Sequence, residues 1–190
     1  MRSNGHFGML SAGHCSGNGL NVYQPDSNGL VMGKVTWRIY GGSNIDALFI
    51  DTPGLSSKYV YTAATTVHPV DTYDARPGFG LSICTDGYAS GQNCNVKLQW
   101  TGGCVTYNDG QTVCGLAYAT STNGGWIVRK GDSGGPVYRY SNADTGLIAE
   151  GVISGKTGPD SQTGSTGVYF IPFGLDLNST FKLLCDYTCS

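Results

Sequence analysis

The chain has 190 residues, 39% of them hydrophobic and only 13% charged, and its formal net charge is −2. This length supports one substantial hydrophobic core or two small cores that share an interface, and the charge gives no electrostatic basis for binding nucleic acid or an anionic membrane surface. Thirty glycines, twelve tyrosines and a single glutamate disfavour long helices and favour short strands joined by tight turns.

Apolar or alternating runs separated by glycines recur along the chain and predict about ten β-strands. These strands indicate an all-β barrel or sandwich. The clearest examples lie in residues 30–41, 46–51, 59–67, 78–84, 95–100, 112–120, 134–140, 146–154 and 167–173. After them, residues 178–187 have the pattern of a short helix with Asn178 or Ser179 as its N-cap.

A proline-containing polar stretch suggests how the chain is divided. It predicts a linker at residues 73–77 between two units, residues 1–72 and 78–176, followed by a C-terminal segment of residues 177–190. The first twenty residues contain no apolar run suited to a signal peptide, and no segment has the length of a membrane span. We therefore expect export by a signal that is not present here, or a fragment of a longer protein.

Seven cysteines indicate an oxidising, extracellular environment. Four of them form two pairs that each close a short, turn-containing loop, as disulfides across hairpins do: Cys84 with Cys94, and Cys104 with Cys114. The chain has no C-x-x-C motif and its three histidines are scattered, so no metal site is expected. The odd count leaves one cysteine without a partner in the chain, and three pairings stay open: those of Cys15, Cys185 and Cys189.

The segment GDSGGP, residues 131–136, is the strongest chemical signal in the sequence. All six residues would occur in this order by chance with a probability on the order of 10⁻⁴. Ser133 is the candidate nucleophile. A glycine at position 131 lets the backbone turn so that the N–H groups of Gly131 and Ser133 point the same way, toward a developing oxyanion.

A serine nucleophile needs a base and a group that orients the base. His14, in SAGHC, follows an apolar run and is the candidate base, whereas His6 and His68 lack a comparable setting and are expected at the surface. Asp46 opens an apolar strand and is the candidate acid, because a buried aspartate needs hydrogen-bond donors such as a histidine N–H. Asp51, at the other end of that strand, is the alternative.

The segments SAGHC, DALFI and GDSGGP, in the order His, Asp, Ser, resemble those of chymotrypsin-fold serine proteases. CTDGYASGQNC and GVISGK make the chain most similar to the bacterial branch of streptogrisin and α-lytic protease. The resemblance implies two antiparallel β-barrels of the six-stranded type with the active site between them. His14 and Asp46 would come from the first barrel and Ser133 from the second.

The resemblance also implies roles around the triad, with some departures. The Ser154 hydroxyl would support Asp46, and the backbone of Ser154, Gly155 and Lys156 would pair with substrate as an added strand. Lys156 stands where the family pocket usually has glycine, so it either favours an acidic side chain or points to solvent.

Other positions depart from the family pattern. Thr85 replaces an arginine that usually pairs with the acid before the nucleophile, which leaves Arg76, Arg129 or backbone amides as partners of Asp132. Ile127 takes the place of a usual cysteine. The family has strands before the histidine, so the first barrel is expected to be truncated at its N-terminus.

The sequence therefore predicts a secreted, monomeric serine endopeptidase that needs no cofactor and acts on polypeptides through an acyl-enzyme. A protein inhibitor or a pro-segment is a further expected partner, and nucleic acid and membranes are not. The alternatives are an inactive binding module of the same fold, an inactive fragment, or an unrelated all-β adhesion or sugar-binding domain.

Overall fold

The computed structural model describes residues 2–3, 6–23, 29–42, 45–54, 57–63, 66–141, 146–159 and 161–174. One 3₁₀ turn, η1 (Gly13–Cys15), interrupts an otherwise all-β succession. The strands of the first half are β1 (Arg2–Ser3), β2 (His6–Ser11), β3 (Asn21–Tyr23), β4 (Val31–Ile39), β5 (Ala47–Asp51), β6 (Tyr59–Ala63) and β7 (Thr66–Tyr73). Those of the second half are β8 (Ser82–Gly87), β9 (Gly91–Thr106), β10 (Thr112–Ser121), β11 (Val128–Arg129), β12 (Pro136–Tyr140), β13 (Leu147–Lys156), β14 (Gly164–Ser165) and β15 (Gly167–Pro172).

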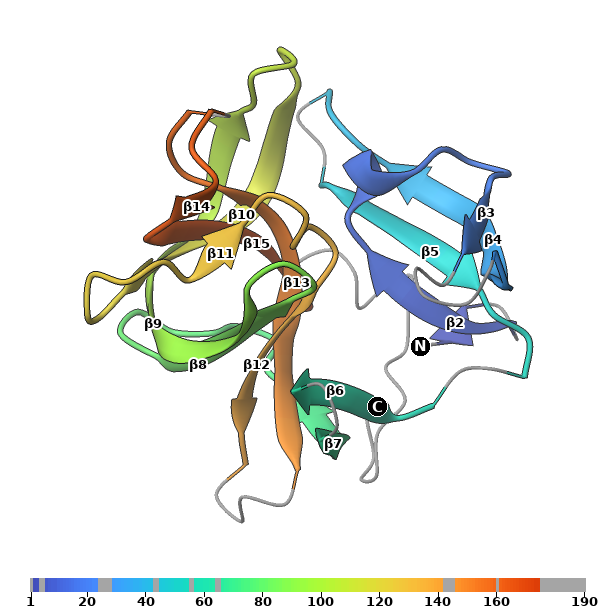
Figure 1. The fold of residues 1–190 in the computed structure, drawn as a ribbon, viewed down its shortest axis with the longest axis horizontal. Coiled ribbons are helices and arrows are strands. Elements are labelled where there is room, and N and C mark those ends of the chain that lie inside the picture. The colour runs from blue at the N-terminus through green and yellow to red at the C-terminus, as the bar shows by residue number, and fades with distance from the viewer. Residues whose placement is uncertain are drawn as a thin grey trace.

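The first sheet contains five strands in the order β1-β2-β5-β4-β3 and is open among the described residues. Figure 1 shows it in blue and cyan beside the second sheet. Side chains alternate along β5, as the period of a strand requires. Leu48 and Ile50 pack with Val35 in a small core of this sheet, whereas Ala47 and Phe49 contribute to a core shared with the second sheet.

The second sheet forms the barrel that carries the GDSGGP segment. Its strands follow the order β12-β8-β9-β10-β15-β13, and the pairing of β12 with β13 closes them into a ring of six. This closure confirms the expected six-stranded barrel. Its interior is apolar and filled mainly by branched side chains and one aromatic ring: Ile83, Val96, Leu98, Ala117, Ala119, Ile127, Val128, Val137, Ile153, Val168 and Phe170.

Strands β6 and β7 extend the second sheet beyond this ring, although they lie before the expected linker at residues 73–77, which β7 reaches at Tyr73. β7 lies against β13, with Leu147 opposite Val70. This pairing is parallel, which differs from the antiparallel order expected throughout. The chain thus passes from the first sheet to the second before residue 59. The division of the chain into units at residues 72 and 78 stays a prediction. The expected helix at residues 178–187 lies outside the described residues.

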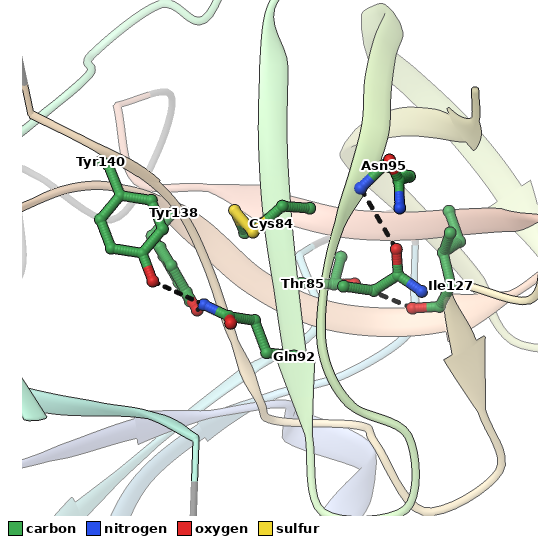
Figure 2. Close-up of a disulfide and its surroundings, with 9 residues drawn as sticks. Cys84, Thr85, Gln92, Asn95, Ile127, Tyr138 and Tyr140 are labelled. Atoms are coloured by element: carbon green, nitrogen blue, oxygen red, sulfur yellow. Dashed lines mark hydrogen bonds between the residues drawn. A yellow bond between two sulfur atoms is a disulfide. The ribbon is translucent and has the colours of Figure 1, made fainter. Parts of the chain in front are cut away.

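Both expected disulfides are present, Cys84–Cys94 and Cys104–Cys114. Figure 2 shows the first, which ties β8 to β9 beside the segment that leads to the nucleophile. Next to it, the Thr85 hydroxyl donates to the Ile127 carbonyl at 2.8 Å. The hairpin therefore fixes the backbone that enters the GDSGGP turn. In the part of the chain that the structure describes, no helix combines the length and hydropathy of a membrane span.

Candidate active site

His14 follows β2 and Asp46 precedes β5, and the two residues lie close together because these two strands are paired. Ser11 at the end of β2 is opposite Leu48 near the start of β5, so the residues just beyond these ends lie side by side. The Asp46 carboxylate is fully buried and accepts the His14 backbone N–H and the His14 Nδ1–H, each at 2.8 Å. These bonds fix the imidazole with Nε2 facing away from Asp46.

The electrostatics of His14 follow from this pairing. Burial lowers the pKa of the imidazole, but the hydrogen bonds and charges of Asp46 and Cys15 outweigh it and raise the pKa well above the ordinary 6.5. Asp51, the alternative acid, instead contacts the exposed His6 ring at 2.9 Å. His68 is half-buried, with its ring centroid 5.3 Å from that of Tyr140, so it is less exposed than an ordinary surface residue.

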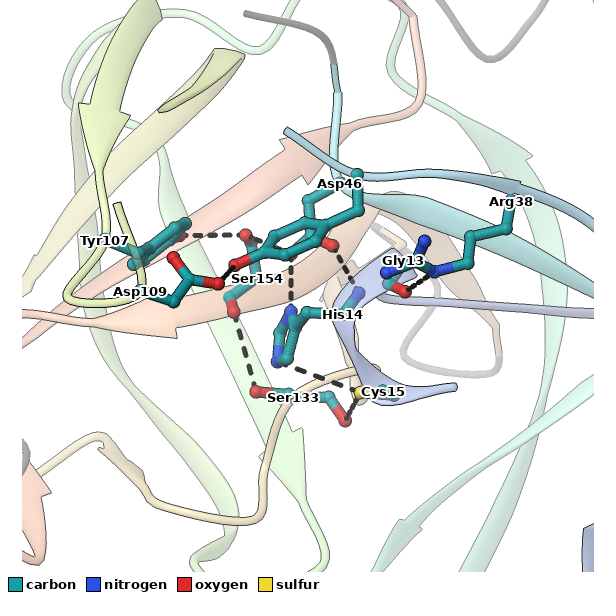
Figure 3. A network of polar contacts seen from close by, with 10 residues as sticks. Gly13, His14, Cys15, Arg38, Asp46, Tyr107, Asp109, Ser133 and Ser154 are labelled. Atoms are coloured by element: carbon teal, nitrogen blue, oxygen red, sulfur yellow. Dashed lines mark hydrogen bonds and ion pairs between the residues drawn. The ribbon is translucent and has the colours of Figure 1, made fainter. Parts of the chain in front are cut away.

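The Ser154 side chain connects Asp46 to the second sheet. Its hydroxyl donates to Asp46 Oδ2 at 2.6 Å, and the Tyr107 hydroxyl contacts the same Ser154 oxygen at 2.8 Å (Figure 3). Because Ser154 uses its only proton on Asp46, Tyr107 must be the donor in the second contact. Burial raises the pKa of Tyr107, which keeps its hydroxyl protonated for this role.

Tyr107 was not a candidate from the sequence. It lies just after β9, in the turn that joins β9 to β10, and nothing in that hairpin sequence distinguishes it from the other eleven tyrosines. Tyr40 was missed as well. Its ring centroid lies 5.7 Å from that of His14, and its hydroxyl donates to Asp109 at 2.6 Å.

Ser133 lies in the tight turn between β11 and β12. Gly131 has a φ of +101°, a conformation that side-chain-bearing residues rarely adopt. Within the described residues, the backbone N–H groups of Asp132 and Gly134 have acceptors, whereas those of Gly131 and Ser133 have none. These two free donors are available to an oxyanion.

Asp132 stabilises this turn by accepting hydrogen bonds from backbone amides. Backbone amides are thus the partners that Asp132 uses in place of the arginine that Thr85 replaces. Its buried carboxylate accepts the N–H groups of Ala89 at 2.8 Å, Ser90 at 3.0 Å and Arg129 at 2.6 Å. These donors satisfy a buried charge without an arginine side chain. The Arg129 contribution comes from its backbone, whereas its guanidinium lies over the Trp126 ring at 5.5 Å.

The Ser133 hydroxyl does not contact His14 in this structure. Its Oγ donates to the Ser154 carbonyl in a long bond of 3.5 Å, and no hydrogen bond joins it to His14 among the described contacts. His14 Nε2 faces the thiol of Cys15 at 3.9 Å, and that thiol also lies 3.6 Å from the Ser133 carbonyl (Figure 3). Cys15 is exposed and not disulfide-bonded within the described chain.

A cavity of about 470 Å³ opens beside these groups and is lined by His14, Gly131 and Ser133. Its other side is the segment Ser154–Lys156, which pairs with β15 along one edge only. The free edge can accept an extended peptide as an additional strand. In the described chain, no cluster of three or more His, Cys, Asp or Glu side chains could hold a metal ion.

Comparisons with known proteins place the fold. Neither a model of a known protein family nor a curated protein sequence matches the chain. Among solved structures, Protease A of Thermobifida fusca is 26% identical with a TM-score of 0.69, and the match covers 90% of this chain and 81% of that one. The chymotrypsin of Cellulomonas bogoriensis is 25% identical at a TM-score of 0.69, covering 94% and 91%.

A third structure, of a glutamic acid specific serine protease that uses a histidine triad in substrate binding, is 20% identical at a TM-score of 0.72, covering 94% and 86%. The chain therefore has the chymotrypsin fold, and its structural neighbours are bacterial serine proteases. This removes the unrelated adhesion or sugar-binding domain from the alternatives.

Proposed function

We propose that this protein is a serine endopeptidase with His14, Asp46 and Ser133 as its catalytic triad. The observation that carries the proposal is the bond between His14 and the buried Asp46 carboxylate, which holds His14 in the lining of the cavity that Ser133 and Gly131, the residues of the two free N–H donors, also line. An inactive binding module would have no need to keep all of these groups together, so we favour the enzyme.

In the proposed reaction, Ser133 Oγ rotates away from the Ser154 carbonyl and attacks the carbon of a peptide bond while His14 Nε2 takes its proton. The C–N bond then breaks, and the leaving amine receives that proton. Water hydrolyses the resulting ester by the same route. Asp46 keeps Nδ1 protonated and stabilises the imidazolium, and each oxyanion donor contributes about 3–4 kcal/mol.

The proposal includes a pH dependence of activity. Only neutral His14 can accept the Ser133 proton, and its pKa is raised above 6.5. We therefore expect kcat/KM for a peptide substrate to increase as the pH rises above 7. We further propose that the protein is secreted and monomeric, acts on polypeptides, and is controlled by a pro-segment or protein inhibitor; the two disulfides support an oxidising location.

A fluorophosphonate probe tests the proposal, since it labels only a serine activated by a base. We expect the wild type to be labelled, Ser133→Ala to be unlabelled and His14→Ala to be labelled far more slowly. Ser121→Ala is the matched control, because the Ser121 hydroxyl contacts only Asn123 at 2.8 Å and does not line the cavity. An unlabelled wild type, or labelling that persists in Ser133→Ala, would overturn the proposal.

A further inference from the structure

The cavity beside Ser133 carries an excess of positive charge. Three of its lining residues are cationic: Arg129 of β11, Lys130 in the turn after it, and Lys156 at the end of β13. The other charged or chargeable lining groups are Asp109 and His14. A chain with a net charge of −2 thus gathers three of its eleven lysines and arginines around one cavity.

Each of the two lysines belongs to one of the segments that would hold a substrate, Lys130 to the nucleophile turn and Lys156 to the free edge, and both line the cavity. Lys130 directly precedes Gly131, whose N–H is one of the free donors. Lys156 ends the free-edge segment of β13. A peptide whose carbonyl lies on the free donors and whose backbone follows this edge would bring the side chain of the same residue to the cavity that Lys130 and Lys156 both line.

None of the three cations forms a salt bridge with an acidic side chain of the described chain. Lys156 is half-buried, and its Nζ donates to the Pro159 carbonyl at 2.7 Å, which holds the ammonium across its own turn and leaves two of its N–H donors. The Arg129 guanidinium lies over the Trp126 ring at 5.5 Å. Among the described residues, the Lys130 ammonium forms no hydrogen bond, ion pair or cation–π contact.

The nearby acids offset only part of this charge, because Asp109 is the one carboxylate among the lining residues of the described chain. Asp109 is exposed in the turn after β9 and is engaged by the Tyr40 hydroxyl at 2.6 Å and the Gln111 N–H at 3.0 Å. Asp132 is buried, accepts three backbone N–H groups and does not line the cavity. The positive charge at the opening is therefore available to a ligand.

We propose that the protein cleaves preferentially after acidic residues, with the substrate carboxylate held between Lys130 and Lys156. This proposal rests on the proposed function and names the substrate class of the same site. The cavity walls next to the lysines include the apolar Val128 and Ile153. They can pack against the methylene groups of a glutamate, so glutamate is preferred over the shorter aspartate, and lysine and arginine are rejected by like charge.

The experiment uses peptide p-nitroanilides that differ only in the residue before the scissile bond: glutamate, glutamine, leucine or lysine. Glutamate and glutamine share shape, so their ratio of kcat/KM isolates the charge. We expect a ratio of about ten at low ionic strength, which corresponds to ~1.4 kcal/mol. In 1 M salt the ratio should fall toward one, because the Debye length shrinks to about 3 Å.

The variants assign the charge to its residues. Lys130→Met and Lys156→Met should each lower the glutamate-to-glutamine ratio, and the double variant should abolish it. Lys34→Met, an exposed lysine on β4 that does not line the cavity, removes the same charge and should leave the ratio unchanged. The ratio compares two substrates on one preparation, so partial misfolding of a variant cancels.

The outcomes separate this proposal from the proposed function. If the fluorophosphonate labels Ser133 and the leucine and glutamine peptides are cleaved as well as the glutamate peptide, the acidic preference is wrong and the endopeptidase stands. A ratio that survives in the double variant also overturns the role of the two lysines. If no peptide is cleaved and no label is incorporated, both proposals fail.

Discussion

Replacing Ser154 by alanine removes the link between the two sheets at the candidate active site. The buried Ser154 hydroxyl donates to the Asp46 carboxylate at 2.6 Å and accepts from Tyr107 at 2.8 Å. A hydrogen bond to a charged group contributes about 1.5–3 kcal/mol, and a neutral one about 1 kcal/mol. We therefore expect Ser154→Ala to lower the free energy of unfolding by about 2–4 kcal/mol, or roughly 5–15 °C in Tm for a chain of this size.

The same substitution should reduce catalysis. The Asp46 carboxylate would lose one of its hydrogen-bond donors, so it would be positioned less firmly and would orient His14 less well. We expect kcat/KM to fall by at least about ten-fold, the factor that corresponds to 1.4 kcal/mol of lost transition-state stabilisation. Urea denaturation and peptide hydrolysis measure the two effects. Tyr107→Phe removes only the neutral bond and should cost about 1 kcal/mol.

Ser165→Ala is the matched control for burial. Ser165 is also buried, but its hydroxyl meets only neutral partners, Thr157 Oγ1 at 2.6 Å and the Gly167 N–H at 3.0 Å. It should therefore cost less stability than Ser154→Ala. An equal loss in the two variants, or an unchanged kcat/KM in Ser154→Ala, would refute the reasoning that the charge of Asp46 gives Ser154 its importance.

Three further predictions concern pH and backbone conformation. The pKa of His14 is raised in the folded state, so its ion pair with Asp46 stabilises the fold fully below pH 6.5 and loses this effect as the pH rises through the raised pKa. The difference in unfolding free energy between wild type and His14→Gln should therefore shrink as the pH rises above 6.5. Burial raises the pKa of Glu150 from 4.5 to about 7 despite its bond to Arg139. The free energy of unfolding should therefore fall by about 3 kcal/mol as the pH rises from 4.5 to 7, and Glu150→Gln should flatten that part of the curve of unfolding free energy against pH. Gly131→Ala forces a side chain into a φ of +101° and displaces an oxyanion donor, so kcat should fall by about 10²–10³ with little change in KM; an unchanged kcat would contradict the assigned donor.

The candidate catalytic residues could be predicted from sequence because each belongs to a short, local pattern. His14 and Ser133 lie in segments whose residue types the chemistry demands, and Asp46 opens an apolar strand. The partners of Asp132 could not be predicted, because two of them are backbone amides about forty residues away in the turn after β8. A backbone N–H donor does not depend on the side chain, so the residue types in the sequence do not indicate it.

Strand pairing set a second limit. The run at residues 59–67 predicted one strand, where the structure has β6 and the start of β7. The parallel pairing of β7 with β13 could not be predicted, because it depends on a partner about eighty residues later. Tyr107 illustrates the same limit for the site. Its contact with Ser154 joins a hairpin turn to a distant strand, so its role follows from topology and not from its own neighbours in the chain.

The contact from Ser154 to Asp46 joins a strand of the second sheet to the first residue before β5 of the first sheet. The proposed base and its acid thus lie at strand ends of the first sheet, whereas the proposed nucleophile and the Ser154 hydroxyl come from the second half of the chain. Either sheet folded alone carries no complete site. If the proposed function holds, the protein would therefore have no peptidase activity while either sheet is unfolded, so an unfolded chain could not cleave its own copies.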